Sequence, residues 1–324
     1  MYRSLLEVYS ELAIDSVSLG MVVIDEIHLP SQPPLIDVAG GSGTYTALGS
    51  RLFAAGAQSR MASLVFSMLE DKLSTRGLLE YEDDTFGPKK FRYTTPPLKA
   101  SPLGLVNTHL LSARAVHQLA TPEEILLQIP MLIQLRTQRG IMTRPFIVWE
   151  PLPVSCTMQN KQNFQQACRL VHVFSPNHFE MAAIFEETAP KTFQPEKLEA
   201  YAQEFSRDTG TTGNGIVIIR AGEHGSLTTQ PLGREVWLPP YYQKGASNVV
   251  DPTGARNAFL GGFIHGWKAS QDVEEASIYA SVAASFALEQ IGLPSCQTDG
   301  DGETWNGVQV MERLAEYKAL LKVS

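Results

Sequence analysis

The segment Asp251–Phe263 (DPTGARNAFLGGF) has the residue types of a loop that binds phosphate. Its small residues Gly254 and Ala255 precede an apolar run, so successive backbone amides can point at one spot where a helix begins. The N-terminal partial charge of that helix adds to the attraction for an anion. Preorganised donors of this kind stabilise a transferring phosphoryl group. The sequence therefore predicts a phosphoryl-binding loop, with a purely structural turn as the alternative.

Two other polar segments each follow a short apolar run that predicts a buried strand. The first is Ser175–Glu180 (SPNHFE) and the second is Arg220–Gly225 (RAGEHG). α/β proteins bind ligands at the carboxyl ends of their strands, so both segments are candidate binding loops. Asn177 and Glu180 could equally form a helix cap with a glutamate at its third position. Glu150, which ends another such run, could be structural.

The N-terminal part combines an acidic residue with a glycine-rich turn. The run at 17–24 is predicted to form one buried strand that places Asp25 at its carboxyl end. Gly40 and Gly41 then lead into a helical pattern at 44–56. A dinucleotide-binding G-x-G-x-x-G motif is excluded because a threonine stands at its third glycine. A plain tight turn is the other interpretation of these glycines.

The elements that must position these residues alternate between strands and helices. Strand-like runs at 104–111, 145–149, 171–174 and 215–219 alternate with helical patterns at 121–137 and 162–169. Alternation of this kind predicts a mostly parallel sheet. Two further helices are expected at 276–290 and 308–321.

Two segments do not fit that alternation. The segment at 26–38 contains three prolines, and the segment at 79–97 mixes charged residues, glycine and proline with aromatics. Both are typical of edge strands or of a hairpin outside the main sheet. We therefore expect a small β lid. The sequence leaves open whether this lid pairs with a second copy of the chain in a homodimer.

Composition narrows the class of protein. The 324 residues are 44% hydrophobic and 19% charged, which is ordinary globular composition and fits one large domain with an insertion. A net charge of -8 argues against a nucleic-acid partner. No stretch of about 18 uncharged apolar residues occurs, which argues against a membrane partner. The three cysteines, Cys156, Cys168 and Cys296, lack a CxxC spacing and predict reduced thiols in the cytoplasm.

The loop at 251–259 resembles the signature of the PfkB carbohydrate kinase family, which includes ribokinase, fructokinase and adenosine kinase. That signature runs Asp, Thr, any residue, Gly, Ala, Gly, Asp, any residue, Phe. The positions that agree are Asp251, Gly254, Ala255 and Phe259. The positions that depart are Pro252, Arg256 and Asn257. The other motifs lie in the family's order along almost the whole chain, and the combination resembles a divergent, fungal-type branch.

The resemblance implies a ribokinase-like α/β fold, in which helices flank a central, mostly parallel β-sheet, with a small β lid. It implies a single domain over residues 1–324, with lid segments at about 26–38 and 79–97. ATP and Mg²⁺ are the implied cofactors. The implied phosphate acceptor is a primary hydroxyl of a sugar, a nucleoside or a related small polyol.

The resemblance also assigns roles to individual positions. The catalytic and anion-binding group is Asn257, Gly254, Ala255 and Arg256. The substrate-binding group is Asp25, Gly40, Gly41 and Tyr45. The nucleotide-binding group is Asn177, Arg220, Gly222, Gly225, Asp251 and Gly254, with Glu180 organising the metal through water.

Four of these positions carry a residue that the family does not usually have, and one of them is Arg256, which stands where the signature has a glycine. Asn257 stands where the family has its aspartate base, Tyr45 where it has an asparagine, and Arg220 where it has a threonine. An amide has almost no proton affinity near neutral pH, and losing a positioned base costs about 10² to 10⁴ in rate. The first hypothesis is therefore a phosphotransferase with weakened catalysis. The second is a pseudokinase that binds a nucleotide or metabolite and acts through a protein partner.

Overall fold

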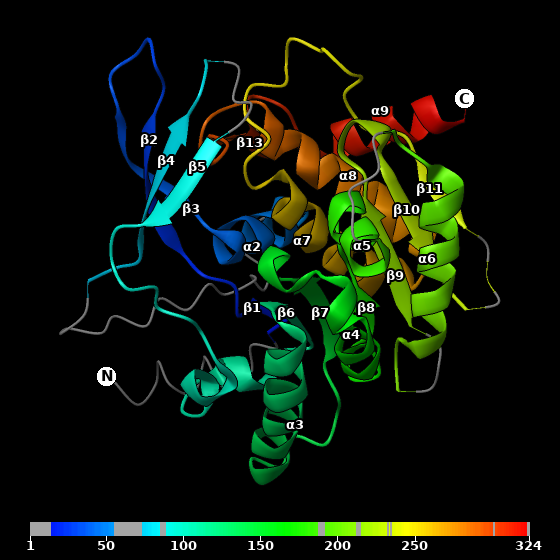
Figure 1. The fold of residues 1–324 in the computed structure, drawn as a ribbon. Coiled ribbons are helices and arrows are strands. Elements are labelled where there is room, and N and C mark those ends of the chain that lie inside the picture. The colour runs from blue at the N-terminus through cyan, green and yellow to red at the C-terminus, as the bar shows by residue number, and fades with distance from the viewer. Residues whose placement is uncertain are drawn as a thin grey trace. The chain divides into compact units, whose positions relative to one another are not determined.

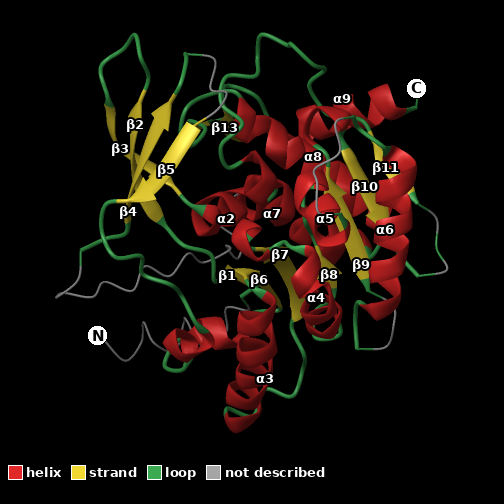
Figure 2. Ribbon diagram, viewed as in Figure 1, coloured by secondary structure: helices red, strands yellow, loops and turns green. Residues whose placement is uncertain are grey.

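The structure, a computed structural model, describes residues 14–54, 73–84, 89–186, 192–211, 215–231, 233, 235–300 and 302–322. The chain divides into two compact units. The first consists of Met1–Val17 with Ser101–Pro240, and the second of Ser18–Ala100 with Tyr241–Ser324. Figure 1 and Figure 2 show the elements of both. Each unit is therefore assembled from two separate stretches of the sequence.

A seven-stranded sheet forms the centre of the first unit, in the order β1-β6-β7-β8-β9-β10-β11 (Figure 1). Its strands are β1 (Ser16–Ser18), β6 (Ala115–Ala120), β7 (Phe146–Pro151), β8 (Val173–Phe174), β9 (Ile216–Arg220), β10 (Ser226–Thr229) and β11 (Val236–Leu238). β6, β7, β8 and β9 pair in parallel, whereas β9, β10 and β11 pair antiparallel. The parallel pairs bring the carboxyl ends of β6 to β9 to one end of the sheet.

Helices follow the parallel strands, and their side chains bury one face of the sheet. They are α3 (Pro122–Gln138), α4 (Lys161–Cys168), α5 (His178–Phe185) and α6 (Pro195–Asp208). Short 3₁₀ turns connect the elements: η1 (Pro102–Leu105), η2 (His109–Ser112), η3 (Pro153–Ser155), η4 (Met158–Asn160) and η5 (Gly222–His224). Trp149 of β7 stacks on Phe164 of α4, with ring centres 5.3 Å apart, and both are fully buried. The predicted α/β class, with a mostly parallel sheet flanked by helices, is confirmed.

The second unit contains a four-stranded sheet in the order β3-β2-β4-β5. Its strands are β2 (Val23–His28), β3 (Leu35–Gly40), β4 (Arg76–Tyr81) and β5 (Lys89–Tyr93). β2 and β4 are parallel, and the two outer pairs are antiparallel. The segments expected to form a lid, at 26–38 and 79–97, contribute to these strands. The unit also contains α2 (Ser42–Leu52), α7 (Ala255–Ser270), α8 (Val273–Leu288), α9 (Val310–Leu321) and a hairpin of β12 (Cys296–Asp299) and β13 (Gly302–Trp305).

Glycines allow α2 and α7 to cross at close range. A Cβ atom at Gly49 would lie 2.0 Å from the carbonyl oxygen of Ala258, and one at Gly261 would lie 2.0 Å from the carbonyl oxygen of Thr46. The Ser50 hydroxyl donates to the Gly261 carbonyl at 2.8 Å. The backbones of the two helices are therefore in contact, and this contact fixes the positions of their N-terminal turns.

The run at 17–24 forms two strands and not the single strand that the sequence predicts. β1 ends at Ser18 and β2 begins at Val23. The break occurs because Gly20 passes so close to α2 that a Cβ atom would lie 2.6 Å from the Gly43 nitrogen. Asp25 consequently lies inside β2 and not at the carboxyl end of a strand.

The run at 104–111 was predicted as a strand, and this prediction is wrong. It contributes to η1 and η2, because Pro102 is suited to the first position of a helical turn and the Thr108 side chain caps the Leu110 amide. The first strand after the lid segments is β6, which begins at Ala115.

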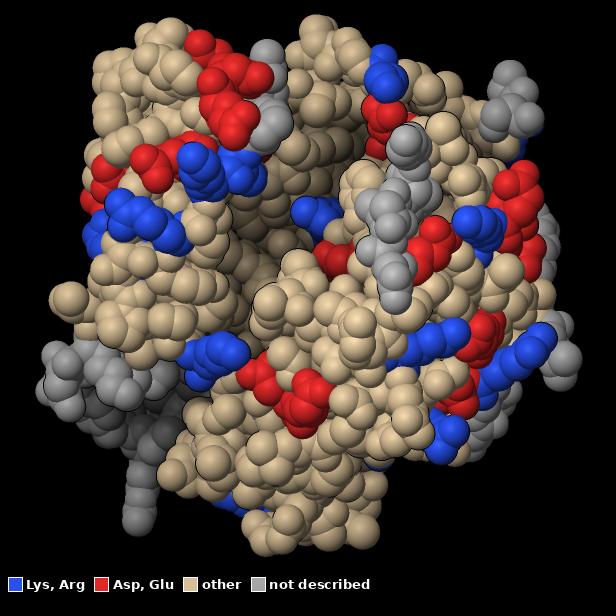
Figure 3. All heavy atoms as spheres, in the orientation of Figure 1, with Lys and Arg blue, Asp and Glu red and all other residues tan. Residues whose placement is uncertain are grey.

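Surface charges are mixed on the face shown in Figure 3, where lysine and arginine side chains are interspersed with aspartate and glutamate. This distribution matches the modest net charge of -8. Among the described residues, no helix is both long enough and apolar enough to cross a bilayer.

Gly261→Ala tests the close crossing of α2 and α7. Alanine is intrinsically the better helix former by about 1 kcal/mol, but its Cβ atom would overlap the Thr46 carbonyl. We expect the clash to dominate and to lower the free energy of unfolding by about 1 to 3 kcal/mol. Urea unfolding followed by circular dichroism measures this difference.

Gly104→Ala is the matched control, since no described atom lies within 4 Å of a Cβ atom built at that glycine. Its effect should stay within about 0.5 kcal/mol. A Gly261→Ala protein as stable as wild type would show that the two helices can separate at no cost.

Candidate active site

The predicted phosphoryl-binding loop lies in the second unit and leads into α7. Gly254 has a left-handed backbone, with φ 81° and ψ −18°, and the helix begins at the next residue. Asp251 is buried, and its Oδ1 accepts a hydrogen bond from the Thr253 amide at 2.9 Å. This tight turn places the loop at the electropositive end of a helix of 16 residues.

A lysine of the four-stranded sheet contacts this loop. The Lys89 ammonium donates to Thr253 Oγ1 at 2.5 Å and to the Tyr81 hydroxyl at 2.8 Å. The Tyr81 hydroxyl also donates to Asp251 Oδ1 at 3.5 Å. Burial lowers the pKa of Lys89, and the charge of Arg256 lowers it further, while Asp251 opposes the shift. Lys89 thus brings a partly desolvated positive charge to the loop.

Asp25 is buried between two glycines of the same sheet. A Cβ atom at Gly40 would lie 2.1 Å from Asp25 Oδ2, and one at Gly77 would lie 2.5 Å from Oδ1. Burial raises the pKa of Asp25 to about 6, with the Lys89 ammonium opposing this shift and the Asp251 carboxylate reinforcing it. Oδ1 has no hydrogen-bond partner among the described residues. The carboxylate can therefore accept a hydrogen bond from a ligand hydroxyl.

Tyr45 packs directly against the phosphoryl-binding loop. A Cβ atom at Gly254 would lie 2.3 to 2.4 Å from three carbon atoms of the Tyr45 ring. Burial, together with the carboxylates of Asp251 and Asp25, raises the pKa of the Tyr45 phenol. Gly41, with φ 92°, is the residue before α2, and Tyr45 lies in the first turns of that helix. The ring fills the space above Gly254 and excludes any larger residue there.

Asn257 and Arg256 occupy the first turn of α7. Arg256 is exposed and Asn257 is half-buried. The Asn257 backbone amide donates to the Gly254 carbonyl at 3.0 Å, which is an ordinary bond of the helix start. The second unit therefore brings together the predicted substrate group and the predicted loop. Their members are Asp25, Gly40, Gly41, Tyr45, Asp251, Gly254, Ala255, Arg256 and Asn257.

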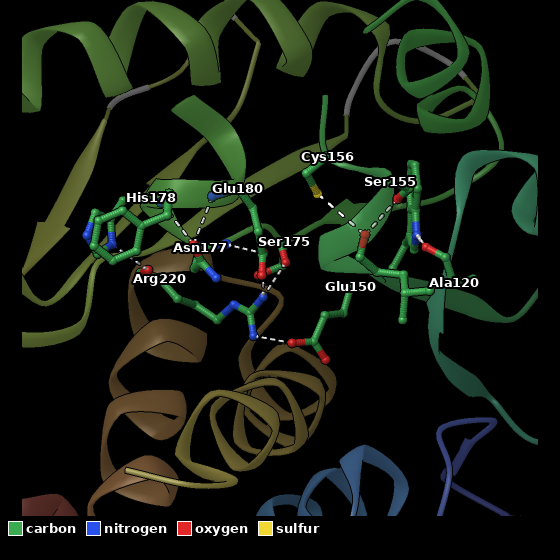
Figure 4. Close-up of polar contacts among 12 residues, drawn as sticks. Ala120, Glu150, Ser155, Cys156, Ser175, Asn177, His178, Glu180 and Arg220 are labelled. Atoms are coloured by element: carbon green, nitrogen blue, oxygen red, sulfur yellow. Dashed lines mark hydrogen bonds and ion pairs between the residues drawn. The ribbon is translucent and has the colours of Figure 1, made fainter. Parts of the chain in front are cut away.

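The remaining predicted residues lie in the first unit, where Asn177 and Glu180 form a capping box (Figure 4). Asn177 Oδ1 accepts from the amides of Phe179 and Glu180, each at 2.9 Å. Glu180 Oε2 accepts from the Asn177 amide at 2.7 Å. The helix cap that the sequence left open is thus present at the start of α5, and it holds the Glu180 carboxylate at the end of β8.

Arg220, the last residue of β9, is buried among acceptors from two neighbouring strand ends (Figure 4). Its Nη1 donates to Glu150 Oε1 at 2.5 Å, and its Nη2 donates to the Ser175 carbonyl at 2.7 Å. The same Nη2 lies 3.8 Å from Glu180 Oε2. His117 Nε2 of β6 lies 3.5 Å from the second Glu150 oxygen. We call these five residues the strand-end cluster.

The electrostatics of the strand-end cluster are dominated by the guanidinium. Burial alone would raise the pKa of Glu150, but the Arg220 charge and the neighbouring His117 outweigh it and lower that pKa to about 2. Glu150 is therefore ionised in the folded protein at all ordinary pH values. Gly222 and Gly225 begin and follow η5, where the chain turns from β9 into β10 beyond the cluster.

The expected Mg²⁺ does not fit the residues that surround Glu180. One Glu180 oxygen already accepts from the Asn177 amide and faces the Arg220 guanidinium. A divalent cation beside that buried guanidinium would meet a like charge in a medium of low dielectric constant. Within the described part of the chain, no group of three or more histidine, cysteine, aspartate or glutamate side chains is arranged to hold a metal ion.

Lys89, Tyr81 and His117 were not predicted from the sequence. The available signal for Lys89 was a pair of lysines at the start of a predicted edge strand, which reads equally well as solubilising charge. His117 and Tyr81 lie in strands with no recognisable motif. Glu150 carried a weak signal, because it ends a predicted strand.

Comparisons with known proteins concern the family and the fold of this chain. The model of the family described as pfkB family carbohydrate kinase matches residues 113–299. An uncharacterized protein of Schizosaccharomyces pombe is 28% identical over 97% of this chain and 95% of its own length. Protein MAK32 of Saccharomyces cerevisiae is 27% identical over 93% of this chain and 91% of its own length. Both relatives are fungal, as the sequence pattern predicts.

Among solved structures, ribokinase of Arabidopsis thaliana complexed with ribose and ATP has a TM-score of 0.58 to this chain. The alignment covers 87% of this chain and 94% of the ribokinase chain, at 16% sequence identity. Similarity at this level of identity shows a shared fold. The predicted ribokinase-like fold is thereby confirmed.

Glu150→Gln tests the buried charge pair through its pH dependence. A carboxyl whose folded pKa lies below its unfolded value of 4.5 contributes stability above that value, and this contribution is lost as the pH falls toward about 2. We expect the variant to lower the free energy of unfolding near neutral pH by about 3 kcal/mol. The deficit should shrink by about 1.4 kcal/mol for each pH unit below the unfolded pKa. Urea unfolding at a series of pH values measures both quantities.

Glu204→Gln is the control, because Glu204 pairs with Lys161 at 2.8 Å but its side chain is 42% exposed. Exposed pairs contribute about 0 to 1 kcal/mol, so its deficit should be small at every pH. A Glu150→Gln deficit that does not change on acidification would contradict the buried charge pair.

Proposed function

Since the chain belongs to the pfkB family of carbohydrate kinases, we propose that it transfers the γ-phosphoryl group of ATP to a hydroxyl of a sugar, a nucleoside or a related small polyol. The observation that carries this proposal is the arrangement of the second unit. There the buried carboxylate of Asp25 has one oxygen without a hydrogen-bond partner among the described residues, and it lies within electrostatic reach of Asp251 in the loop and of the Lys89 ammonium, which contacts that loop.

The acceptor side of the proposed reaction rests on Asp25. A carboxylate accepts hydrogen bonds from hydroxyl groups and offers two oxygens, which suits the adjacent hydroxyls of a sugar or polyol. Because its pKa is about 6, this acceptor ability grows as the pH rises through that value. The space beside Gly40 holds Asp25 Oδ2, and the space beside Gly41 holds the Met21 carbonyl, so these glycines fix where the carboxylate lies. The two oxygens of that carboxylate support a small hydroxylated molecule as the acceptor.

The donor side rests on positive charge. The N-terminus of α7, the Lys89 ammonium and the Arg256 guanidinium all belong to the loop or contact it. Together they can stabilise the oxygens of a transferring phosphoryl group. ATP is the phosphoryl donor that we propose. The Mg²⁺ expected with it has no fitting ligand set at Glu180, so we assign no step to a metal ion.

The proton of the attacking hydroxyl is the weak point of the proposed reaction. Asn257 cannot accept it, and the absence of a base costs about 10² to 10⁴ in rate. Phosphoryl transfer depends mainly on positioning and on charge stabilisation, so slow transfer survives this loss. The proposed enzyme is accordingly a slow kinase.

A second candidate function is a pseudokinase that binds a nucleotide or metabolite and acts through a protein partner. Two specific observations favour it. The Tyr45 ring fills the space above Gly254. Arg220 is buried between the carboxylates of Glu150 and Glu180 and pairs with both, so its guanidinium occupies the place where a ligand or a metal ion would contact them. The homodimer through the lid and the cytoplasmic location stay predictions.

Asn257→Asp combined with Arg256→Gly separates the two candidate functions. Restoring the base and the glycine should raise kcat by about 10² to 10⁴ if the chain is a slow kinase. Product formation from ATP is followed by mass spectrometry across a panel of sugars and nucleosides. Arg256→Gly alone is the control, since it opens the loop without adding a base. A double variant that forms no phosphorylated product would favour the pseudokinase.

Lys89→Met tests the assignment of the anion-binding charge. Methionine keeps most of the apolar stem and removes the ammonium, so the Kd for ATP should rise about tenfold, or about 1.4 kcal/mol. Calorimetric titration of the purified chain measures it. Lys90→Met is the matched control, because neighbouring side chains in a strand point to opposite faces, so Lys90 does not share the contacts of Lys89 with Thr253 and Tyr81. Equal losses in both variants would contradict a specific role for Lys89.

A further inference from the structure

The strand-end cluster surrounds Arg220 with the ligand types that divalent cations use. Carboxylate oxygens come from Glu150 and Glu180, and a backbone carbonyl comes from Ser175. Hard cations such as Mg²⁺ and Mn²⁺ are bound by carboxylate, carbonyl and water oxygens. Figure 4 shows the Glu150 and Ser175 groups converging on one guanidinium.

The parallel sheet fixes the positions of these ligands independently of the arginine. Glu150 lies in β7, Ser175 directly follows β8, and Glu180 is held by its hydrogen bond from the Asn177 amide. The Ser175 hydroxyl, wholly buried at the same strand end, has no hydrogen-bond partner within the described residues. The cluster therefore contains an oxygen, that of the Ser175 hydroxyl, to which the guanidinium makes no hydrogen bond.

The charges also point to a cation. Two buried carboxylates face a single guanidinium, with His117 beside the far oxygen of Glu150. A buried carboxylate that loses its cationic partner must take up a proton or another cation, because an uncompensated buried charge is strongly unfavourable.

We propose that Arg220 fills a divalent-cation site of the first unit. Glu150, Glu180 and the Ser175 carbonyl bind the guanidinium in place of a metal ion, and they bind Mn²⁺ once the guanidinium is removed. Wild-type protein accordingly holds no divalent metal at this place. The inference is independent of the proposed function, because it holds whether or not the chain transfers phosphate.

The test is direct binding of Mn²⁺ to the full chain, measured by the loss of the free-ion signal in electron paramagnetic resonance. Arg220→Thr shortens the side chain and keeps a polar group. We expect it to bind one equivalent of Mn²⁺ with a Kd of about 10⁻⁴ to 10⁻³ M, and Mn²⁺ should raise its melting temperature. Adding Glu150→Gln should abolish both effects. Arg313→Thr is the matched control, since Arg313 is similarly buried and, among the described residues, pairs with the single carboxylate of Glu289.

Two results would overturn the inference. One is a folded Arg220→Thr protein that binds no more Mn²⁺ than Arg313→Thr. The other is a wild-type protein that binds an equivalent of Mn²⁺ and loses it in Glu180→Gln, which keeps the capping box because glutamine also serves at that position. This second comparison needs no arginine variant, so it decides the matter even if Arg220→Thr does not fold. Equal Mn²⁺ binding by wild type and Glu180→Gln supports the inference.

Discussion

A buried arginine joins the carboxyl ends of three parallel strands in the first unit. Arg220 closes β9, and its guanidinium binds Glu150 of β7 and the carbonyl that follows β8. Burying three charged groups is costly unless each is paired and hydrogen-bonded. The capping box of α5 meets that condition for Glu180, because the Asn177 amide donates to it. The start of α5 and the strand-end cluster thus depend on one cation.

In the second unit, close packing of side chains against glycines determines where the site residues lie. The Asp25 carboxylate lies between Gly40 and Gly77, and the Tyr45 ring lies against Gly254. A Cβ atom at any of these three glycines would overlap the side chain beside it. The crossing of α2 over α7 at Gly49 and Gly261 brings these groups to the loop. The positions of the buried acid, of the aromatic ring and of the loop at 251–257 are therefore consequences of one pattern of small residues. Three residues that depart from the family pattern in this unit, Tyr45, Arg256 and Asn257, lie in α2 and α7 without interrupting either helix.

Local signals in the sequence predicted the parts of the site that are set by local backbone geometry. The loop at Gly254 and the cap at Asn177 were both visible, since a glycine before a helix or an Asn-x-x-Glu spacing specifies its own turn. Lys89 was not visible, because its partner Thr253 lies 164 residues away. The partners of Arg220 lie 70 and 45 residues away, so its ion pair and hydrogen bond could not be predicted from the sequence around it. The sequence showed only that an arginine stands where the family has a threonine. The break at Gly20 was also missed, because its cause is contact with a helix that comes later in the chain.

We propose that the second unit binds a nucleotide phosphate and a hydroxylated acceptor together. This binding is tested most directly by the melting temperature of the purified chain with ATP, with a panel of sugars and nucleosides, and with both. Ligand binding stabilises the folded state by RT ln(1 + [L]/Kd), about 2.7 kcal/mol at a hundredfold excess over Kd. We expect the melting temperature to rise with ATP and to rise further with one acceptor. No rise with any nucleotide at millimolar concentration would contradict it.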